Sequence, residues 1–441
     1  MSDKTGARPK TLVIHIGDHK TGTTTIQNAL AVGSIQLHDA ELFYPAKMNH
    51  NYLTGFITSY RKSTPLPKHL EDRDGLEEVA AQIAASSADY AVLSAEAFEN
   101  IPAPEFHDLV ETFFRGCADR IHIVAYVRPH AQRILSSYAE QIKIGWYRGT
   151  MQEFFDHNLQ NGRFHYMPRF SQWRELFGED FTLRPMIRKE LKNGSVLDDF
   201  AHVAFDGQPC TVEEFEPENQ AMTVRELALM YFLQGQFQEQ DPWLRHTLGW
   251  ELSRQLDRSR SESEAKVRKL VMARDLAEAA SAAYRSDATA MDAEFFGGRP
   301  LLQNALRDME KQSAPRAPSL DPAEFFSPEH LRNLSVMAKI IEGMLERQGK
   351  WPSYFHSHRI KDIERHKMAR LGLDENGDPL DPEADGQSVS DAMTSDKTVT
   401  KIAPAQATAA SATQSTQPAP QTRVLAGAAA GGTAVPEKDQ P

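Results

Sequence analysis

Apolar residues along this chain follow two periods, one typical of strands and one typical of helices. Short continuous apolar runs alternate, through the first half of the chain, with longer stretches whose apolar positions recur every three or four residues. The pattern predicts strands at 11–17, 90–94, 121–127 and 181–187. It predicts helices between and after them at about 24–37, 75–87, 105–115, 130–143 and 168–177.

Strands that alternate with helices in this way predict an α/β fold in which a parallel sheet is covered by helices. Ligands of such sheets bind at the carboxyl ends of the strands. Four candidate residues lie at predicted strand ends, namely Gly17, Ser94, Glu96 and Arg128. We therefore expect one ligand cleft where these strand ends converge.

The first predicted strand runs into a glycine-containing loop and then a helix. Gly17 and Gly22 have the spacing of the Walker A nucleotide motif, but Thr23 stands where that motif requires lysine. The loop carries its lysine earlier, at Lys20. The amides that open the helix, from Thr23 to Thr25, are unpaired donors, and the helix dipole favours an anion beside them. The loop therefore predicts an anionic ligand.

A second motif follows the strand predicted at 121–127. Arg128 ends that strand, and Ser136 follows in the next predicted helix. Pro129 suits the first helical turn, because the amide donor that proline lacks is unpaired there in any residue. Arg128 at the strand tip and Ser136 two turns along are placed to hold one phosphate from two sides.

The two motifs resemble those of sulfotransferases that use 3'-phosphoadenylyl sulfate (PAPS). The run Lys-Thr-Gly-Thr-Thr that begins at Lys20 is similar to the 5'-phosphosulfate loop of that family. Positions that match its 3'-phosphate motif are Arg128, Arg133, Ser136 and Tyr138. The resemblance is to bacterial carbohydrate-type members; it covers roughly residues 10–205 and extends more loosely to about 300.

This resemblance implies a P-loop NTPase-like parallel sheet flanked by helices, and transfer of a sulfuryl group from PAPS without a metal. The acceptor is expected to be a hydroxyl or amine on a carbohydrate or another small bacterial molecule. Lys20 is expected to stabilise charge on the leaving phosphate oxygen. The residues expected to hold the 5'-phosphosulfate are Lys20, Thr21, Gly22, Thr23, Thr24 and Thr25. Those expected to hold the 3'-phosphate are Arg128 and Ser136.

An acceptor hydroxyl must also lose a proton, and two residues are candidates for the catalytic base. His50 lies near the place where carbohydrate sulfotransferases carry a catalytic glutamate, and a neutral imidazole accepts a proton near pH 7. Glu96 lies at a strand end that faces the same cleft. We slightly favour His50, and both residues stay candidates.

Composition divides the chain further. After a flexible N-terminus, we expect an α/β domain and a helical extension that caps it, then a partly ordered segment and a disordered tail rich in Ala, Thr, Gln, Ser and Pro. The boundaries are 1–10, 11–215, 216–350, 351–386 and 387–441.

Charge and cysteine content limit the partners and the compartment. A net charge of −12 argues against nucleic acid as the main partner. Cys117 and Cys210 lie far apart without metal-binding spacing, which is typical of reduced packing residues. No segment has the apolar core of a signal peptide or the length of a membrane span. We expect a cytoplasmic enzyme with a small-molecule or glycan acceptor.

Two other functions remain open. A P-loop kinase or NTPase requires the Walker lysine, whose place Thr23 occupies, and an acidic strand end for magnesium. A non-catalytic anion-binding module, with the tail recruiting partners, is the second alternative. Intact Lys20, Arg128 and Ser136 argue against a decayed site.

Overall fold

A computed structural model describes residues 9–213, 221–260, 269–347, 351–374 and 377–379. The chain divides into two compact units, Met1–Leu371 and Gly372–Pro441. Within the second unit the structure describes an antiparallel bridge between Leu373 and Pro379. The predicted disordered tail, 387–441, and most of the predicted flexible N-terminus lie outside the described residues.

A five-stranded parallel sheet organises the first unit, as the α/β prediction requires. Its strand order is β3-β4-β1-β5-β6. Every neighbouring pair in it is parallel. The strands of this sheet are β1 (Thr11–His15), β3 (Leu42–Phe43), β4 (Tyr90–Ser94), β5 (Arg120–Val127) and β6 (Phe181–Pro185). The hydrophobic pattern predicted four of them and missed β3, which is too short to show a period.

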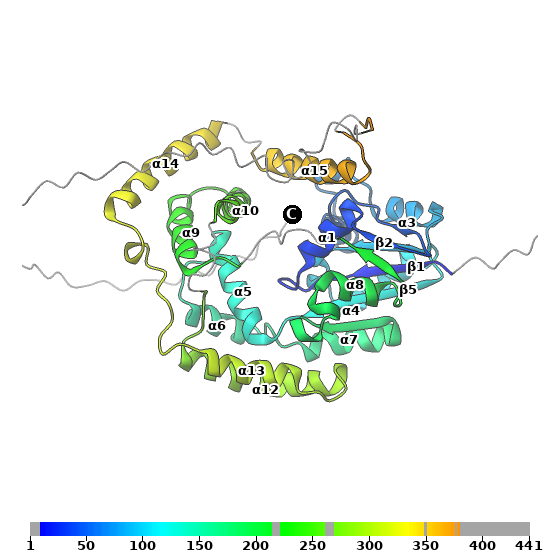
Figure 1. Ribbon diagram of the computed structural model, residues 1–441, viewed down its shortest axis with the longest axis horizontal. Helices are drawn as coiled ribbons and strands as arrows, with labels where there is room; N and C mark the ends of the chain where they lie inside the picture. Colours follow the sequence, from blue (N-terminus) through cyan, green and yellow to red (C-terminus); the bar gives the residue numbers. More distant parts are fainter. Residues whose placement is uncertain (1–8, 214–220, 261–268, 348–350, 375–376, 380–441) are drawn as a thin grey trace, which may run out of the picture. The chain divides into compact units, whose positions relative to one another are not determined.

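Five of the helices of the sheet region were predicted, and three were not (Figure 1). The full set is α1 (Thr23–Val32), α2 (Leu53–Lys62), α3 (Leu76–Ala85), α4 (Ala103–Leu109), α5 (His130–Lys143), α6 (Met151–Gln160), α7 (Met167–Phe177) and α8 (Val196–Ala204). The three that were not predicted are α2, α6 and α8. The predicted first helix was too long at its C-terminus. It ends at Val32 because Gly33 takes a left-handed conformation, φ 71°, and the chain then enters β2 (Ile35–Leu37), which pairs antiparallel with β7 (Cys210–Val212).

Alternate residues of each strand pack against helices on opposite faces of the sheet. Val13, Val92 and Val124 belong to a core shared with α1 and α8. Leu12 and Ile14, on the other face, belong to a larger core that includes α3, α4 and α7. The central strands β1, β4 and β5 are thus buried on both faces, which explains why they appear in the sequence as mostly apolar runs.

Helices make up most of the rest of this unit. They are α9 (Val224–Gln236), α10 (Pro242–Ser259), α12 (Arg274–Phe295), α13 (Leu301–Gln312), α14 (Pro328–Arg347) and α15 (Trp351–Arg370). The predicted helical extension, 216–350, is interrupted at Lys269, which forms an antiparallel bridge with Thr223. None of the described helices combines the length and the apolar character that crossing a bilayer requires.

A buried hydrogen bond between a histidine and an aspartate joins the sheet region to α12. His130 Nε2 lies 2.8 Å from Asp287 Oδ2, and neither side chain is appreciably exposed. The same aspartate accepts hydrogen bonds from the backbone amides of Tyr166 and Met167. Since His130 is the first residue of α5, this contact fixes the start of the helix that carries the second predicted motif.

Candidate functional site

The loop between β1 and α1 lies at the carboxyl end of the sheet, against the segment that follows β4. Gly17 has φ +80°, a conformation that favours glycine. A Cβ atom added to Gly17 would lie 2.6 Å from the Cα of Glu96. Glu96 begins the short helix η2 (Glu96–Asn100). Gly17 is therefore required both by its backbone conformation and by close packing against η2.

Two of the predicted phosphate-binding threonines shape the loop from inside. The hydroxyls of Thr21 and Thr23 donate to the backbone carbonyl of Asp18, at 2.5 and 3.4 Å, and both side chains are buried. Gly22 then caps α1 with φ 83° and supplies no side-chain acceptor. These hydroxyls hold the loop in shape and are already occupied.

The start of α1 leaves donors free for a ligand. Within the described residues, the backbone amides of Thr23, Thr24 and Thr25 have no acceptor, and the first amide bonded inside the helix is that of Ile26. The Thr24 and Thr25 side chains are partly exposed, and within the same residues their hydroxyls have no partner. A ten-residue helix whose first turn carries free amides is a suitable anion site.

Lys20 reaches across to the helix of the second motif. Its Nζ lies 3.0 Å from Glu140 Oε2 on α5, and Lys143 Nζ lies 2.9 Å from the same oxygen. The Lys143 ammonium also lies 3.4 Å from the centre of the Trp250 ring, on α10. Lys20 keeps about a third of its side chain exposed, at 32%, whereas Lys143 is 7% exposed.

These charged groups shift one another's pKa values. Burial alone would raise the pKa of Glu140, but Lys143 and Lys20 lower it to about 2. Burial lowers the pKa of Lys143 to about 8, against the opposing charge of Glu140. Lys20 is therefore held beside an ionised carboxylate, which an anionic ligand would have to replace.

Arg128 differs from every other arginine near the loop. It follows β5, and its backbone carbonyl accepts a hydrogen bond of 2.8 Å from the Tyr166 hydroxyl. Within the part of the chain that the structure describes, its guanidinium has no hydrogen bond and no ion pair. Burial first, and then the charge of Arg133, lower the pKa of Arg128. A partly buried cation without a counter-charge is suited to bind an anion.

The structure brings the two motifs to adjacent strands. β1 pairs with β5 up to His15 and Val124, and the amide of Tyr126 then donates to the carbonyl of Gly17 at 3.3 Å. Ser136 is partly exposed on α5, one helical turn before Glu140, and its hydroxyl donates to the carbonyl of Arg133. The Lys20 side chain thus contacts α5 one helical turn from Ser136.

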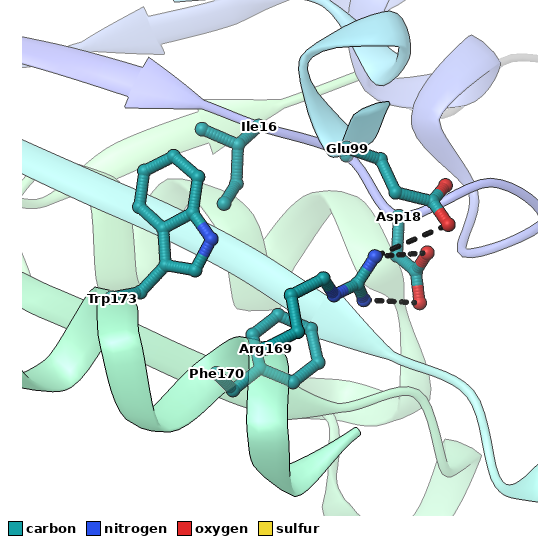
Figure 2. Close-up of a pocket in the computed structure, with 7 residues that line it drawn as sticks. Ile16, Asp18, Glu99, Arg169, Phe170 and Trp173 are labelled. Carbon is teal, nitrogen blue, oxygen red and sulfur yellow. Dashed lines mark hydrogen bonds and ion pairs between the residues drawn. The ribbon is translucent and has the colours of Figure 1, made fainter. Parts of the chain in front are cut away.

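Arg133 lies in a buried cluster instead of on the helix surface. Its Nη2 lies 3.3 Å from Asp18 Oδ1 and 3.0 Å from Glu99 Oε1. Arg169 on α7 contacts the same two carboxylates, with Nη2 at 3.2 Å from Asp18 Oδ2 and Nη1 at 3.2 Å from Glu99 Oε1. Figure 2 shows the Arg169 guanidinium pointing at both carboxylates. We call these four residues the acid–arginine cluster.

The cluster is balanced in charge, and its inner part is shielded from water. Arg133 is 1% exposed and Asp18 is 3% exposed. Burial by itself would raise the pKa of Glu99, but Arg133, the hydrogen bond from His19 and Arg169 hold it well below its usual value. Burial raises the pKa of Asp18 despite both arginines. Glu99 is thus the carboxylate of this pair that stays ionised over the wider pH range.

A small pocket borders this cluster. Its walls are the loop at Ile16, Gly17 and Asp18, then Glu99, and α7 through Arg169, Phe170 and Trp173 (Figure 2). Asp18 and Glu99 lie on the side away from Trp173, and the Arg169 guanidinium packs on the Phe170 ring at 4.3 Å. The charged side chains that line this pocket, Asp18, Glu99 and Arg169, already form ion pairs within the acid–arginine cluster.

The two predicted bases lie in different surroundings. His50 is fully buried; its Nδ1 accepts the amide of Ser94 at 3.1 Å, and its ring packs edge-on against Tyr44 at 5.1 Å. Burial lowers the pKa of His50 to about 4. Glu96 is partly exposed, and its charge acts on both His19 and Lys143. The surroundings therefore favour Glu96 over His50 as a group able to meet an acceptor.

Sequence reasoning missed three carboxylates and one histidine of this region. Asp18 and His19 lie inside the predicted loop, while Glu99 and Glu140 come from distant segments. The concentration of basic residues after β5 was a usable signal, since it included Lys143 and Arg169. It did not separate them from Arg148, which packs on the Tyr231 ring at 4.2 Å.

Comparison with known proteins leaves the family of this chain open. No family model matches it, and no curated protein matches it. Among solved structures it is similar to a sulfotransferase from Alicyclobacillus acidocaldarius, at 14% sequence identity, over 52% of this chain and 93% of that chain, with a TM-score of 0.29. A TM-score of 0.29 is too low to establish a shared fold.

Proposed function

We propose that this protein is a sulfotransferase that moves a sulfuryl group from PAPS to a hydroxyl or amine on a carbohydrate or another small acceptor. The observation that carries the proposal is the pairing of two anion-binding features at one sheet edge. One is the set of free amides that opens α1, and the other is the guanidinium of Arg128, which has no counter-charge among the described residues. PAPS carries phosphates at two positions on one adenosine, so each of the two features could bind one of its anionic groups.

The loop would hold the 5'-phosphosulfate mainly through its backbone. The amides of Thr23, Thr24 and Thr25 are free within the described residues, and so are the Thr24 and Thr25 hydroxyls. Thr21 and Thr23 contribute by fixing the loop through Asp18. Gly22 permits the turn into α1.

Lys20 would stabilise the charge that develops on the leaving phosphate oxygen. Positioned cations at developing charge are usually a large part of catalysis. In the ligand-free protein Lys20 is bonded to Glu140, so it must exchange that carboxylate for the ligand. Lys143 remains to balance Glu140 after the exchange, because it contacts the same oxygen.

Arg128 and Ser136 would hold the 3'-phosphate. Arg128 supplies a charge-assisted donor that costs no existing ion pair among the described residues. Ser136 would redirect its hydroxyl from the Arg133 carbonyl, a bond within its own helix turn. Each residue can therefore reach a phosphate without unfolding any element.

Glu96 is the better of the two predicted bases, because His50 is enclosed and its Nδ1 is occupied. The kinase or NTPase alternative is weakened by the same loop. Thr23 stands in the place of the Walker lysine with its side chain buried against Asp18.

Ligand-induced stabilisation tests the proposal. Thermal unfolding should be followed with 3'-phosphoadenosine 5'-phosphate (PAP), with adenosine 5'-phosphate, and with ATP and magnesium. PAP should raise the midpoint most. A larger shift with ATP and magnesium would support a kinase instead, and no shift with PAP would refute the proposal.

Arg128→Met locates the 3'-phosphate. Charge-assisted hydrogen bonds contribute about 1.5–3 kcal/mol, so the variant should bind PAP tenfold to about 150-fold more weakly and no better than adenosine 5'-phosphate. Arg285→Met is the matched control, since Arg285 is exposed on α12, away from the loop. PAP binding that is equal in both variants would exclude Arg128 from the phosphate site.

A further inference from the structure

His19 and Glu99 form a dyad beside the predicted catalytic lysine. His19 Nδ1 contacts Glu99 Oε2, and the backbone amide of His19 donates to the same oxygen at 2.8 Å. An ionised carboxylate only accepts hydrogen bonds, so Nδ1 must carry the proton. The neutral imidazole therefore keeps its lone pair on Nε2.

Glu99 is fixed from behind while His19 opens outward. Arg133 and Arg169 each contact Glu99 Oε1, and Arg133 Nη2 also donates to Oε2 at 3.3 Å, so His19 shares Oε2 with Arg133. The His19 side chain is 38% exposed, against 12% for Glu99. Within the described residues Nε2 has no hydrogen-bond partner, so it is free to meet a ligand.

The dyad borders the same space as Lys20. His19 and Lys20 are consecutive, yet their side chains reach different elements, His19 to η2 and Lys20 to α5. The charge of Glu96 acts both on His19 and on Lys143, which shares Glu140 with Lys20. A ligand seated on the loop between η2 and α5 thus has Lys20 on one side and His19 on the other.

We infer that His19, oriented by Glu99, is the base that accepts the proton of the acceptor hydroxyl. The inference rests on the proposed function. As the acceptor oxygen forms its bond to sulfur, its proton passes to His19 Nε2. The bond between sulfur and the 5'-phosphate oxygen breaks, and its electron pair stays on that oxygen, beside Lys20. Solvent then removes the proton from the imidazolium.

A histidine held by a carboxylate is a recurring arrangement for general bases, because the carboxylate fixes the tautomer and stabilises the imidazolium that forms. Neither predicted base has this arrangement. His50 accepts a backbone amide with Nδ1 and is fully buried. Glu96 has no hydrogen-bond donor among the described residues, and its charge instead supports a proton on His19.

Electrostatics around His19 agree with this role. Burial alone would lower the pKa of His19, but the hydrogen bond and charge of Glu99, together with the charge of Glu96, raise it despite Arg133. A base must be deprotonated to act, so activity should rise with pH through a value above the ordinary 6.5 of histidine. Removing the charge of Glu99 should move that rise to lower pH.

Nitrogen NMR of histidine-labelled protein tests the dyad without any acceptor. His19→Gln assigns the signal, and the backbone amide of residue 19 can still bond Glu99 in that variant. His19 should show protonated Nδ1 and unprotonated Nε2 at high pH, and Glu99→Gln should lower its pKa. Protonated Nε2 in the neutral ring would overturn the inference.

Turnover tests the chemical role. The probe is PAPS, with PAP release measured from pH 5.5 to 9, first with water and then with a monosaccharide mixture as acceptor. General bases contribute typically 10²–10⁴-fold, so His19→Gln should lose at least about 100-fold in rate and the dependence on pH. His69→Gln, at an exposed histidine in η1 (Lys68–Leu70), is the matched control and should match wild type.

PAP binding separates the possible failures. His19→Gln should bind PAP within about threefold of wild type, because the backbone amides of the loop remain. If wild-type protein does not bind PAP, the proposed function fails. If wild type binds PAP but His19→Gln keeps its rate, or Glu96→Gln alone removes the pH dependence, the dyad is not the base.

Discussion

Arginines at the carboxyl edge of the sheet differ in whether they form an ion pair with a carboxylate. Arg133 and Arg169 both contact Asp18 and Glu99. Arg128 follows the strand that leads into the same helix, and no carboxylate contacts it within the described residues. The first two arginines complete a neutral, buried cluster. The third leaves a positive charge in a partly buried place.

This difference distinguishes a charged residue that stabilises the fold from one that is available to bind a ligand. A buried ion pair is weak evidence for net stability, but removing one partner leaves the other uncompensated and is costly. A buried cation without an ion-pair partner destabilises the ligand-free protein, because its desolvation cost is not offset until an anionic ligand binds. Removing such a cation should therefore not be costly. The same substitution at Arg133 and at Arg128 should therefore have opposite effects on the ligand-free protein.

The largest effect is expected for Arg133→Met. Two carboxylates, Asp18 and Glu99, would lose their most buried counter-charge, and the free energy of unfolding should fall by about 3–5 kcal/mol. Chemical denaturation followed by circular dichroism measures it. Arg115→Met is the control, because its pair with Glu111 is exposed and exposed pairs contribute at most about 1 kcal/mol. Equal losses in the two variants would contradict the distinction between the arginines.

Local sequence was sufficient for most of the sheet. Three of its longer strands, β1, β4 and β5, are buried along most of their length and appear in the sequence as mostly apolar runs. All four longer strands begin and end within two residues of the prediction. The short strands β2 and β3 carry too few residues to show a period. Gly33 stops the first helix early, and its left-handed turn was the missed signal.

The site was harder to predict, because its chemistry depends on contacts between distant segments. The resemblance to a phosphate motif grouped Arg133 with Arg128, but only the fold shows that Asp18 and Glu99 neutralise the first. Two of the predicted loop hydroxyls, Thr21 and Thr23, face inward for a related reason, since the loop needs internal bonds to hold its shape. The sequence records which residues are present and leaves their partners open.

Lys20 lies between the two extremes, since it has a carboxylate partner but is partly exposed. The pKa of Glu140 is about 2 in the folded protein, below its ordinary 4.5. Its contribution to stability is thus present above pH 4.5 and is lost as the pH falls toward 2. Between pH 5 and pH 3 the wild-type protein should lose about 2 kcal/mol that Glu140→Gln does not lose.

Urea denaturation at pH 5 and pH 3 measures this difference. Glu175→Gln, at an exposed glutamate of α7, is the control and should behave as wild type. If Glu140→Gln loses as much stability in acid as wild type, Glu140 does not form ion pairs with Lys20 and Lys143 in solution. Lys20 would then lack a carboxylate partner, as Arg128 does among the described residues.

The smallest effect, and the one that most directly tests the comparison, is expected for Arg128→Met without ligand. Methionine keeps most of the apolar stem and removes a charge that burial already disfavours, as the lowered pKa of Arg128 indicates. The free energy of unfolding should stay equal to wild type or rise by up to about 1 kcal/mol, while Arg285→Met leaves it unchanged. A loss of more than about 2 kcal/mol, approaching that of Arg133→Met, would mean that Arg128 has a structural partner and is not held ready for a phosphate.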